Sequence, residues 1–246
     1  MRRGLLLLLT ALLVLLPSVA FAQSVTVDLG SAGDGSAATR IIQLTALIAL
    51  LSLAPSLLVM LTAFARIVIV LSLLRAALGT QSTPPNTVLI GLALFLTFFV
   101  MQPAFEQAWT LGILPMTEGR VSEIEGMRLA AEPFRRFMVA NMRAEDLSLF
   151  LDIADLPPPE SPAQTPWRAL VPAFLVGELR RAFEIGFLLF VPFLVIDLVV
   201  ASVLMSMGMM MLPPTVVSLP FKLIFFVLVD GWRLVSGSLA QSFVAG

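Results

Sequence analysis

The sequence predicts an all-α, membrane-associated protein built from kinked helical hairpins, and three observations lead to this fold class. First, 59% of its 246 residues are hydrophobic and the mean hydropathy is +0.99, far above the range of soluble globular domains. Second, the apolar residues gather in long runs with almost no charge, each close to the roughly 20 residues that a bilayer-spanning helix needs. Third, Pro55, Pro192 and Pro220 interrupt these runs, as in the broken helices that pack inside membrane proteins.

Composition also narrows the classes of function. The chain contains no cysteine, histidine or tyrosine, so disulfides, thiol nucleophiles and the commonest nucleophile–base pairs and transition-metal sites are excluded. Its net charge of −1 does not indicate a basic surface for nucleic acid. We therefore expect a protein that is not an enzyme and that uses no metal or other cofactor.

Residues 1–22 have the pattern of a cleavable signal peptide. They combine a basic start, an apolar run too short to cross a bilayer, and small residues at Ala20 and Ala22, where cleavage is expected. The alternative is an uncleaved first transmembrane helix. Cleavage would place the mature N-terminus outside the cytoplasm, with residues 23–40, rich in Ser, Gly, Ala and Asp, as a flexible exported lead-in.

Residues 41–105 are expected to form a first helical hairpin. Its two apolar runs are Ile41–Phe64 and Thr87–Phe105, joined by a polar connection that carries Arg66 and Arg75 and no acid. Positive residues between two spans favour a cytoplasmic location for the connection. This agrees with an exported N-terminus.

Residues 106–184 differ in kind, because they carry most of the charge and a proline-rich segment. By alternation they should be extracytoplasmic, and the spacing of their apolar residues predicts helices. Ser122 and Glu125 have the spacing of a capping box at the start of one helix. Glu145 and Asp146 favour the electropositive start of another.

Prolines suggest further boundaries in this region. Pro133 is expected to kink or split the helix that Ser122 begins. Thr165 and Pro166 predict the start of a third helix, with threonine as the cap and proline in the first turn.

Residues 185–246 are expected to form a second helical hairpin with a short tail. Two apolar runs, Ile185–Met205 and Met209–Val229, flank a turn with Gly208 for conformational freedom. Methionine is unbranched and adaptable, so it often fills irregular gaps in a core. A cluster at a turn is not a helical stripe, however, and in a ring of copies it could seal a passage. The cluster consists of Met205, Met207, Met209, Met210 and Met211.

The second hairpin also carries two isolated charges, Asp197 and Lys222, the latter being the only lysine in the chain. An acid in the middle of a span costs about 2.5–3.5 kcal/mol, so it requires a partner or a polar cavity. The two residues lie roughly 20 and 18 Å from the turn at 1.5 Å per helical residue. They could pair within one chain or between neighbouring subunits. The alternative is a neutralised acid and a lysine that reaches the membrane interface.

Five segments of the chain resemble the FliP family of the flagellar type III export gate. They cover most of the mature chain and are highly specific. The segments are FARIVIVLSLLRAALGTQSTPPNTVLIGLALFLTFFVMQP (64–103), RAEDLSLFL (143–151), PAFLVGELRRAFEIGF (172–187), PFLVIDLVVASVLMSMGMMMLPP (192–214) and SLPFKLIFFVLVDGW (218–232).

The resemblance implies that several copies, in a ring that is pentamer-like, join FliQ and FliR at the flagellar basal body in the bacterial inner membrane. Unfolded axial proteins would pass through this gate, whose helices form a tapering cone. The methionine turn would match the family's gasket and the Asp197 and Lys222 side chains its buried charges. Residues 106–184 would lie on the periplasmic side. The matching assembly contacts there would be Arg143, Glu178, Phe137 and Phe150.

Two other functions are alternatives to an export gate of the flagellum. One is the equivalent subunit of a virulence secretion system, against which the signal peptide argues. The other is an ion-coupled transporter of small solutes that uses Asp197 as its proton or cation site. No inverted repeat is visible and acids within the runs are few, which weakens the transporter interpretation.

Overall fold

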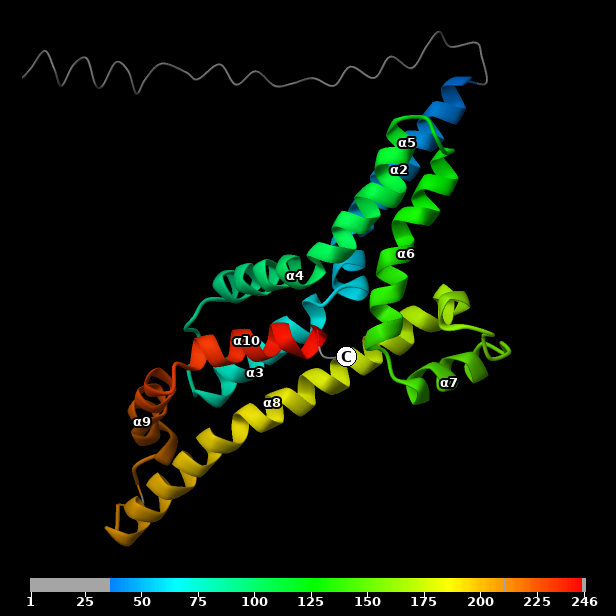
Figure 1. Cartoon of the computed structure of the whole chain (residues 1–246). Coiled ribbons are helices and arrows are strands. Elements are labelled where there is room, and N and C mark those ends of the chain that lie inside the picture. The colour runs from blue at the N-terminus through cyan, green and yellow to red at the C-terminus, as the bar shows by residue number, and fades with distance from the viewer. Residues whose placement is uncertain (1–35, 210, 245–246) are drawn as a thin grey trace, which may run out of the picture. The chain divides into compact units, whose positions relative to one another are not determined.

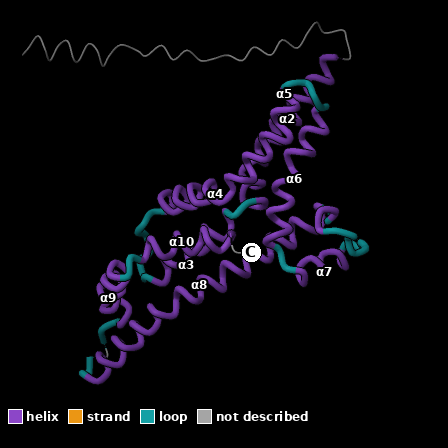
Figure 2. The backbone as a smooth tube through the Cα atoms, in the orientation of Figure 1, coloured by secondary structure: helices purple, strands orange, loops and turns teal. Residues whose placement is uncertain are grey.

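The computed structural model describes residues 36–209 and 211–244, and in this part of the chain every regular element is a helix (Figure 2). The prediction of an all-α fold is therefore confirmed. The expected signal peptide, 1–22, lies outside the described residues.

The chain divides into two units, 1–52 and 53–246. Helix α2 (Ser36–Leu61) begins in the first unit and ends in the second. The other elements all belong to the second unit. They are α3 (Phe64–Ala77), α4 (Asn86–Ala108), the π-helix η1 (Trp109–Ile113), α5 (Leu114–Thr117), α6 (Glu123–Asn141), α7 (Ala144–Ile153), the 3-10 helix η2 (Pro162–Gln164), α8 (Trp167–Ser206), α9 (Pro214–Leu228) and α10 (Gly231–Val244).

The main core of the second unit forms where α3 packs along α8 (Figure 1). The two helices approach closely at Gly186, where a Cβ atom would lie 2.2 Å from Cδ1 of Leu73. Apolar residues of α3 recur every three or four positions, so they form one buried face. This face includes Ile67, Val70, Leu71 and Leu74.

The expectation of a polar connection that begins at Arg66 is wrong, because residues 64–77 form α3. Arg66 is only 1% exposed and its charge is neutralised by Glu178 of α8. Because Glu178 neutralises its charge, Arg66 can lie buried within an otherwise apolar helix. Arg75, at the end of α3, donates hydrogen bonds to the Pro84 carbonyl and to Asn86 Oδ1. The inference that the connection is cytoplasmic thus depends on Arg75 alone.

Helices α4 and α6 pack side by side, and the π-turn η1 contacts α6. This contact is tight, because a Cβ at Gly112 would lie 2.4 Å from the Ala130 backbone nitrogen and 2.5 Å from the Gly126 carbonyl oxygen. Glycine at 112 lets the two backbones meet. The same run, Asn86–Thr117, continues through η1 as one long apolar helix.

Half of the predicted capping box is present at the start of α6. Ser122 Oγ accepts a hydrogen bond from the Glu125 backbone N–H at 3.3 Å. The Glu125 carboxylate, however, pairs with Arg128 one turn further on, at 2.7 Å. The Arg128 guanidinium lowers the pKa of the exposed Glu125 carboxyl through this hydrogen bond.

The expected boundaries at 105/106 and 184/185 both fall inside helices, α4 and α8. Hydropathy changes at these positions, but no backbone break accompanies the change. Pro133 lies inside α6 without splitting it. Helix α7 begins with Glu145 and Asp146 in its first turn, as predicted. Helix α8 begins at Trp167, with Pro166 rather than Thr165 in the capping position.

Two of the described helices, Asn86–Thr117 and Trp167–Ser206, are long and apolar enough to cross a membrane. Two bent pairs raise the number to four if each pair counts as one span. They are Pro55–Leu61 with Phe64–Ala77, bent by 85°, and Pro214–Leu228 with Gly231–Phe243, bent by 63°. The sequence predicts four apolar runs in kinked hairpins, and the structure shows two of these runs as strongly bent helix pairs.

Candidate functional site

The end of α8, the methionine turn and α9 form a helical hairpin (Figure 1). Gly208 adopts φ +72°, a left-handed conformation that glycine enters without steric cost. Pro213 and Pro214 then occupy the cap and first positions of α9, where a missing N–H is harmless. Local backbone chemistry therefore fixes both the chain reversal and the start of the second arm.

The four methionines of this turn that the structure describes are exposed and do not pack in the core of their own chain. Met211 is 98% exposed, and Met210 lies outside the described residues. Met205, Met207 and Met209 are between 41% and 65% exposed. The alternative that these four side chains fill a core does not hold within a single chain. Their role as a gasket stays a prediction.

Asp197 of α8 and Lys222 of α9 form an ion pair, with Lys222 Nζ 2.7 Å from Asp197 Oδ2. Ser218 donates a second hydrogen bond to Asp197 Oδ1. Lys222 is only 5% exposed and also donates to the Ala77 carbonyl, at the end of α3, at 3.2 Å. The pair therefore joins both arms of the hairpin to α3, and both carboxylate oxygens of Asp197 are occupied.

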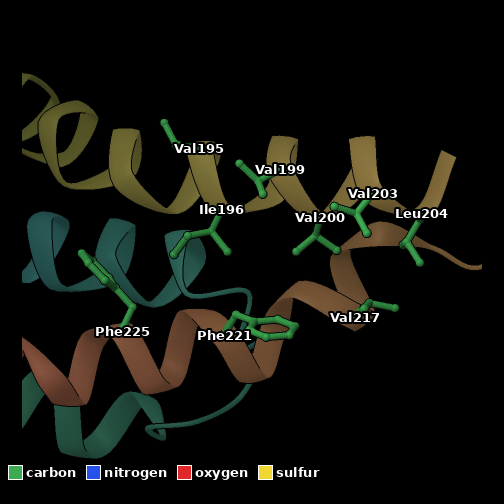
Figure 3. A pocket seen from close by; sticks show the side chains of 9 residues that line it. All are labelled: Val195, Ile196, Val199, Val200, Val203, Leu204, Val217, Phe221 and Phe225. Atoms are coloured by element: carbon green, nitrogen blue, oxygen red, sulfur yellow. The ribbon is translucent and has the colours of Figure 1, made fainter. Parts of the chain in front are cut away.

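Two cavities lie along the hairpin. One of about 550 Å³ is lined by apolar side chains of α8 and α9, among them Ile196 and Val200, which point from α8 toward α9, and Phe221 of α9 (Figure 3). The other, of about 710 Å³, is lined by both members of the ion pair together with residues of α3 and of its connection to α4. The hairpin thus offers an apolar groove for packing and a polar hollow beside its charges.

The predicted assembly residues occupy different environments. Glu178 is fully buried and pairs with Arg66 of the same chain, so it cannot touch a neighbouring subunit in this conformation. Arg143 lies 3.4 Å from Glu145 and is partly exposed. Phe137 packs in the core, and Phe150 is half-buried. The structure does not bring these residues to one surface, and their part in assembly stays a prediction.

Sequence reasoning missed the buried environment of Arg66. The guanidinium donates two hydrogen bonds to the Glu178 carboxylate and two to Ser242, and it stacks on Phe243, 3.7 Å from the ring centroid. Helical spacing of apolar residues continues on both sides of Arg66. That pattern predicts a helix, and a single charge within it implies a buried partner.

The described residues contain no group of three or more acidic, histidine or cysteine side chains that could hold a metal ion. The unusual features of the site are an exposed turn, a groove and an internally neutralised charge pair.

The fold and this site define an all-helical membrane protein with an exposed methionine hairpin. The family model of the FliP family matches residues 47–239, which include both arms of the hairpin and both members of the ion pair. The chain belongs to the FliP family.

Curated relatives agree with this assignment. The chain is 56% identical over 234 residues to the flagellar biosynthetic protein FliP of Caulobacter vibrioides, covering 94% of this chain and 87% of the relative. It is 51% identical over 234 residues to that of Rhizobium meliloti, covering 92% and 94%. It is 50% identical over 217 residues to that of Bacillus subtilis, covering 88% and 98%.

Proposed function

We propose that this chain is a subunit of the flagellar protein export gate, where copies of it assemble in a ring with FliQ and FliR. Unfolded axial proteins of the flagellum pass through the channel that the ring encloses. The subunit is a passive, non-enzymatic component of the pore. Its family membership and its apolar helices support this role.

The observation that carries the proposal is the exposed methionine turn between α8 and α9. An apolar turn with Met211 98% exposed is costly in water and needs a covering surface. Unbranched thioether side chains can adapt to varied neighbours. Around a symmetry axis, such turns from identical chains seal a passage at rest and yield to a passing polypeptide.

The ion pair of Asp197 and Lys222 keeps the two arms of the hairpin in register in this proposal. Each arm carries one charge, and Ser218 and the Ala77 carbonyl satisfy the remaining hydrogen bonds. A neutralised pair can remain buried while the turn moves. The same pairing argues against an ion-coupled solute transporter, because Lys222 already supplies the counter-charge of the Asp197 carboxylate.

The proposed location is the bacterial inner membrane at the flagellar basal body. A signal peptide at residues 1–22 exports the N-terminus, and 23–40 follow it as a lead-in. The proposed organisation keeps 41–105 as the first hairpin, 106–184 as the periplasmic region and 185–246 as the second hairpin.

Cysteine cross-linking tests the proposed seal directly, because the chain contains no native cysteine. Met209→Cys and Met211→Cys should each cross-link copies of the chain in complexes isolated from swimming cells. Ile124→Cys, at a 78% exposed position on α6, is the control and should give no such product. Absence of methionine-turn cross-links in complexes that still export flagellin contradicts the seal.

Deletion tests the broader function. Loss of swimming and of flagellin export, both restored by the intact gene, is expected. Uptake of a small solute by the chain alone in proteoliposomes would instead favour the transporter.

A further inference from the structure

Arg66 is a buried charged residue whose contacts extend beyond a simple ion pair. Its side chain comes from α3 and is 1% exposed. Nε and Nη2 donate to the Glu178 carboxylate of α8, with the Nε bond at 2.9 Å. Nη1 donates to the Ser242 carbonyl at 3.2 Å and to Ser242 Oγ at 3.0 Å, both on α10. One guanidinium therefore joins three helices.

The end of α10 is also held by two stacking contacts with the ring of Phe243. The guanidinium of Arg66 lies 3.7 Å from the centroid of the Phe243 ring. The ring of Phe137, from α6, stacks on Phe243 at 5.9 Å between centroids. Phe243 is buried, so water does not compete with either contact.

Helix α10 in turn continues the second arm of the hairpin (red in Figure 1). We define the return arm as α9 together with α10, which meet at a 63° bend. Within α9, only Ser218, Lys222 and Phe226 are buried. By contrast, α10 buries a continuous face ending at Phe243. The return arm therefore has one contact region at the Asp197–Lys222 pair and a second at the far end of α10.

We propose that Arg66 is a positioning residue that anchors α10 and thereby fixes the return arm of the methionine hairpin. The consequence for gating depends on the proposed function, but the anchoring itself does not. A lysine could not replace it, because its single ammonium group lacks the planar fork that bonds Glu178 and Ser242 while stacking on a ring. Without the contacts from Arg66 to Ser242 and Phe243, the C-terminal end of α10 is no longer fixed and the return arm can shift.

The decisive variant is the double substitution Arg66→Met, Glu178→Met. It removes both charges together and replaces them with unbranched apolar side chains, so neither is left buried and unpaired. It should keep α3 and α8 packed while it deletes every contact from Arg66 to α10. Hydrogen exchange, measured on the purified full-length chain in detergent, should then be at least tenfold faster for residues 235–243. Exchange in α3 and α8 should stay within twofold of the wild type.

Two further variants keep the test decisive if the double variant does not fold. Phe243→Leu retains the Arg66–Glu178 pair but loses both stacking contacts, and it should also speed exchange in α10. Leu234→Ala is the matched control at an exposed position of the same helix and should leave that exchange unchanged. Slow, wild-type exchange of α10 in both the double variant and Phe243→Leu overturns the proposal.

Exchange also separates this inference from the proposed function. Failure of the methionine cross-links together with fast α10 exchange would overturn the seal and leave the anchor standing. Observed methionine cross-links together with wild-type hydrogen exchange in α10 would support the seal and overturn the anchor.

Discussion

At the scale of single residues, two buried cations are matched by acids on a neighbouring helix. Lys222 pairs with Asp197, and Arg66 pairs with Glu178. In each pair the cation also donates to an oxygen outside the pair, at the Ala77 carbonyl for Lys222 and at Ser242 for Arg66. A charge in an apolar helix is tolerated only under such full compensation.

Removal of one member of a buried pair should therefore be costly. We expect Lys222→Gln to destabilise the folded chain by about 3–5 kcal/mol, because it leaves the Asp197 carboxylate without its counter-ion. Thermal unfolding in detergent and swimming in soft agar measure the effect. The exchange of the two residues, Asp197→Lys with Lys222→Asp, should restore function only in part, because a carboxylate at 222 would face the Ala77 carbonyl.

An exposed pair of the same kind supplies the control. Arg233 lies 3.8 Å from Asp230, and both are largely exposed. Arg233→Gln should change stability by less than about 1 kcal/mol. Equal effects at positions 222 and 233 would contradict the importance of the buried pair.

The sequence indicated part of this arrangement. Equal distances from the turn place Asp197 and Lys222 at similar depths, but distance alone could not decide between pairing in one chain and pairing between chains. Its charge alone predicts Arg66 in the polar connection between the first two apolar runs. Nothing near it in the sequence indicates its partner Glu178, which lies 112 positions away. A contact over such a separation leaves no local pattern.

At the scale of elements, close packing depends on glycine where helices meet backbone to backbone. Gly112 is such a position, since its Cβ would overlap backbone atoms of Ala130 and Gly126 rather than a movable side-chain end. Gly112→Ala should therefore destabilise the contact between η1 and α6 by at least about 1–3 kcal/mol. The melting temperature of the purified chain gives the measurement.

Gly91, in the same apolar helix run, has no atom within 4 Å of its Cβ position. Gly91→Ala should leave stability unchanged or raise it by roughly 0.5–1 kcal/mol, because alanine loses less conformational freedom on folding. A melting temperature of Gly112→Ala at or above that of Gly91→Ala would contradict the packing argument.

Helix starts marked by capping or acidic residues are predicted better than boundaries placed at a change in polarity. Ser122 and the pair Glu145 and Asp146 mark the starts of α6 and α7, because capping is local chemistry. The boundary at 184/185 was placed at a change in polarity, yet α8 continues through it. Backbone hydrogen bonds persist across such a change when no residue interrupts them, and the environment of a helix can change along its length.

At the scale of the whole molecule, much of the apolar surface is left for other molecules to cover. In an apolar 18-residue stretch of α8, only 11% is buried within the chain. The groove of about 550 Å³ between α8 and α9 is open and apolar. Hydropathy predicts this surface, but it does not distinguish lipid from another subunit as its cover.

A charge placed on this surface should block assembly. Val199 lines the groove and is 58% exposed, so Val199→Glu should leave the helices of the chain intact and prevent the formation of ring complexes. Native electrophoresis of detergent extracts measures the assembled fraction. Ile124→Glu, at a 78% exposed position on α6, is the control and should assemble normally. Normal rings from Val199→Glu would show that the groove faces lipid or solvent in the complex.

Helix α8 runs for 40 residues, with Glu178, the partner of Arg66, in its first third and the methionine turn at its C-terminal end. Its length is about 60 Å at 1.5 Å per residue. At that length, a tilt of α8 by one degree about its N-terminal end displaces its C-terminal end by about 1 Å. In the proposed gate, the position of the methionine turn would therefore depend on how firmly the N-terminal part of α8 is held by its contacts with α3.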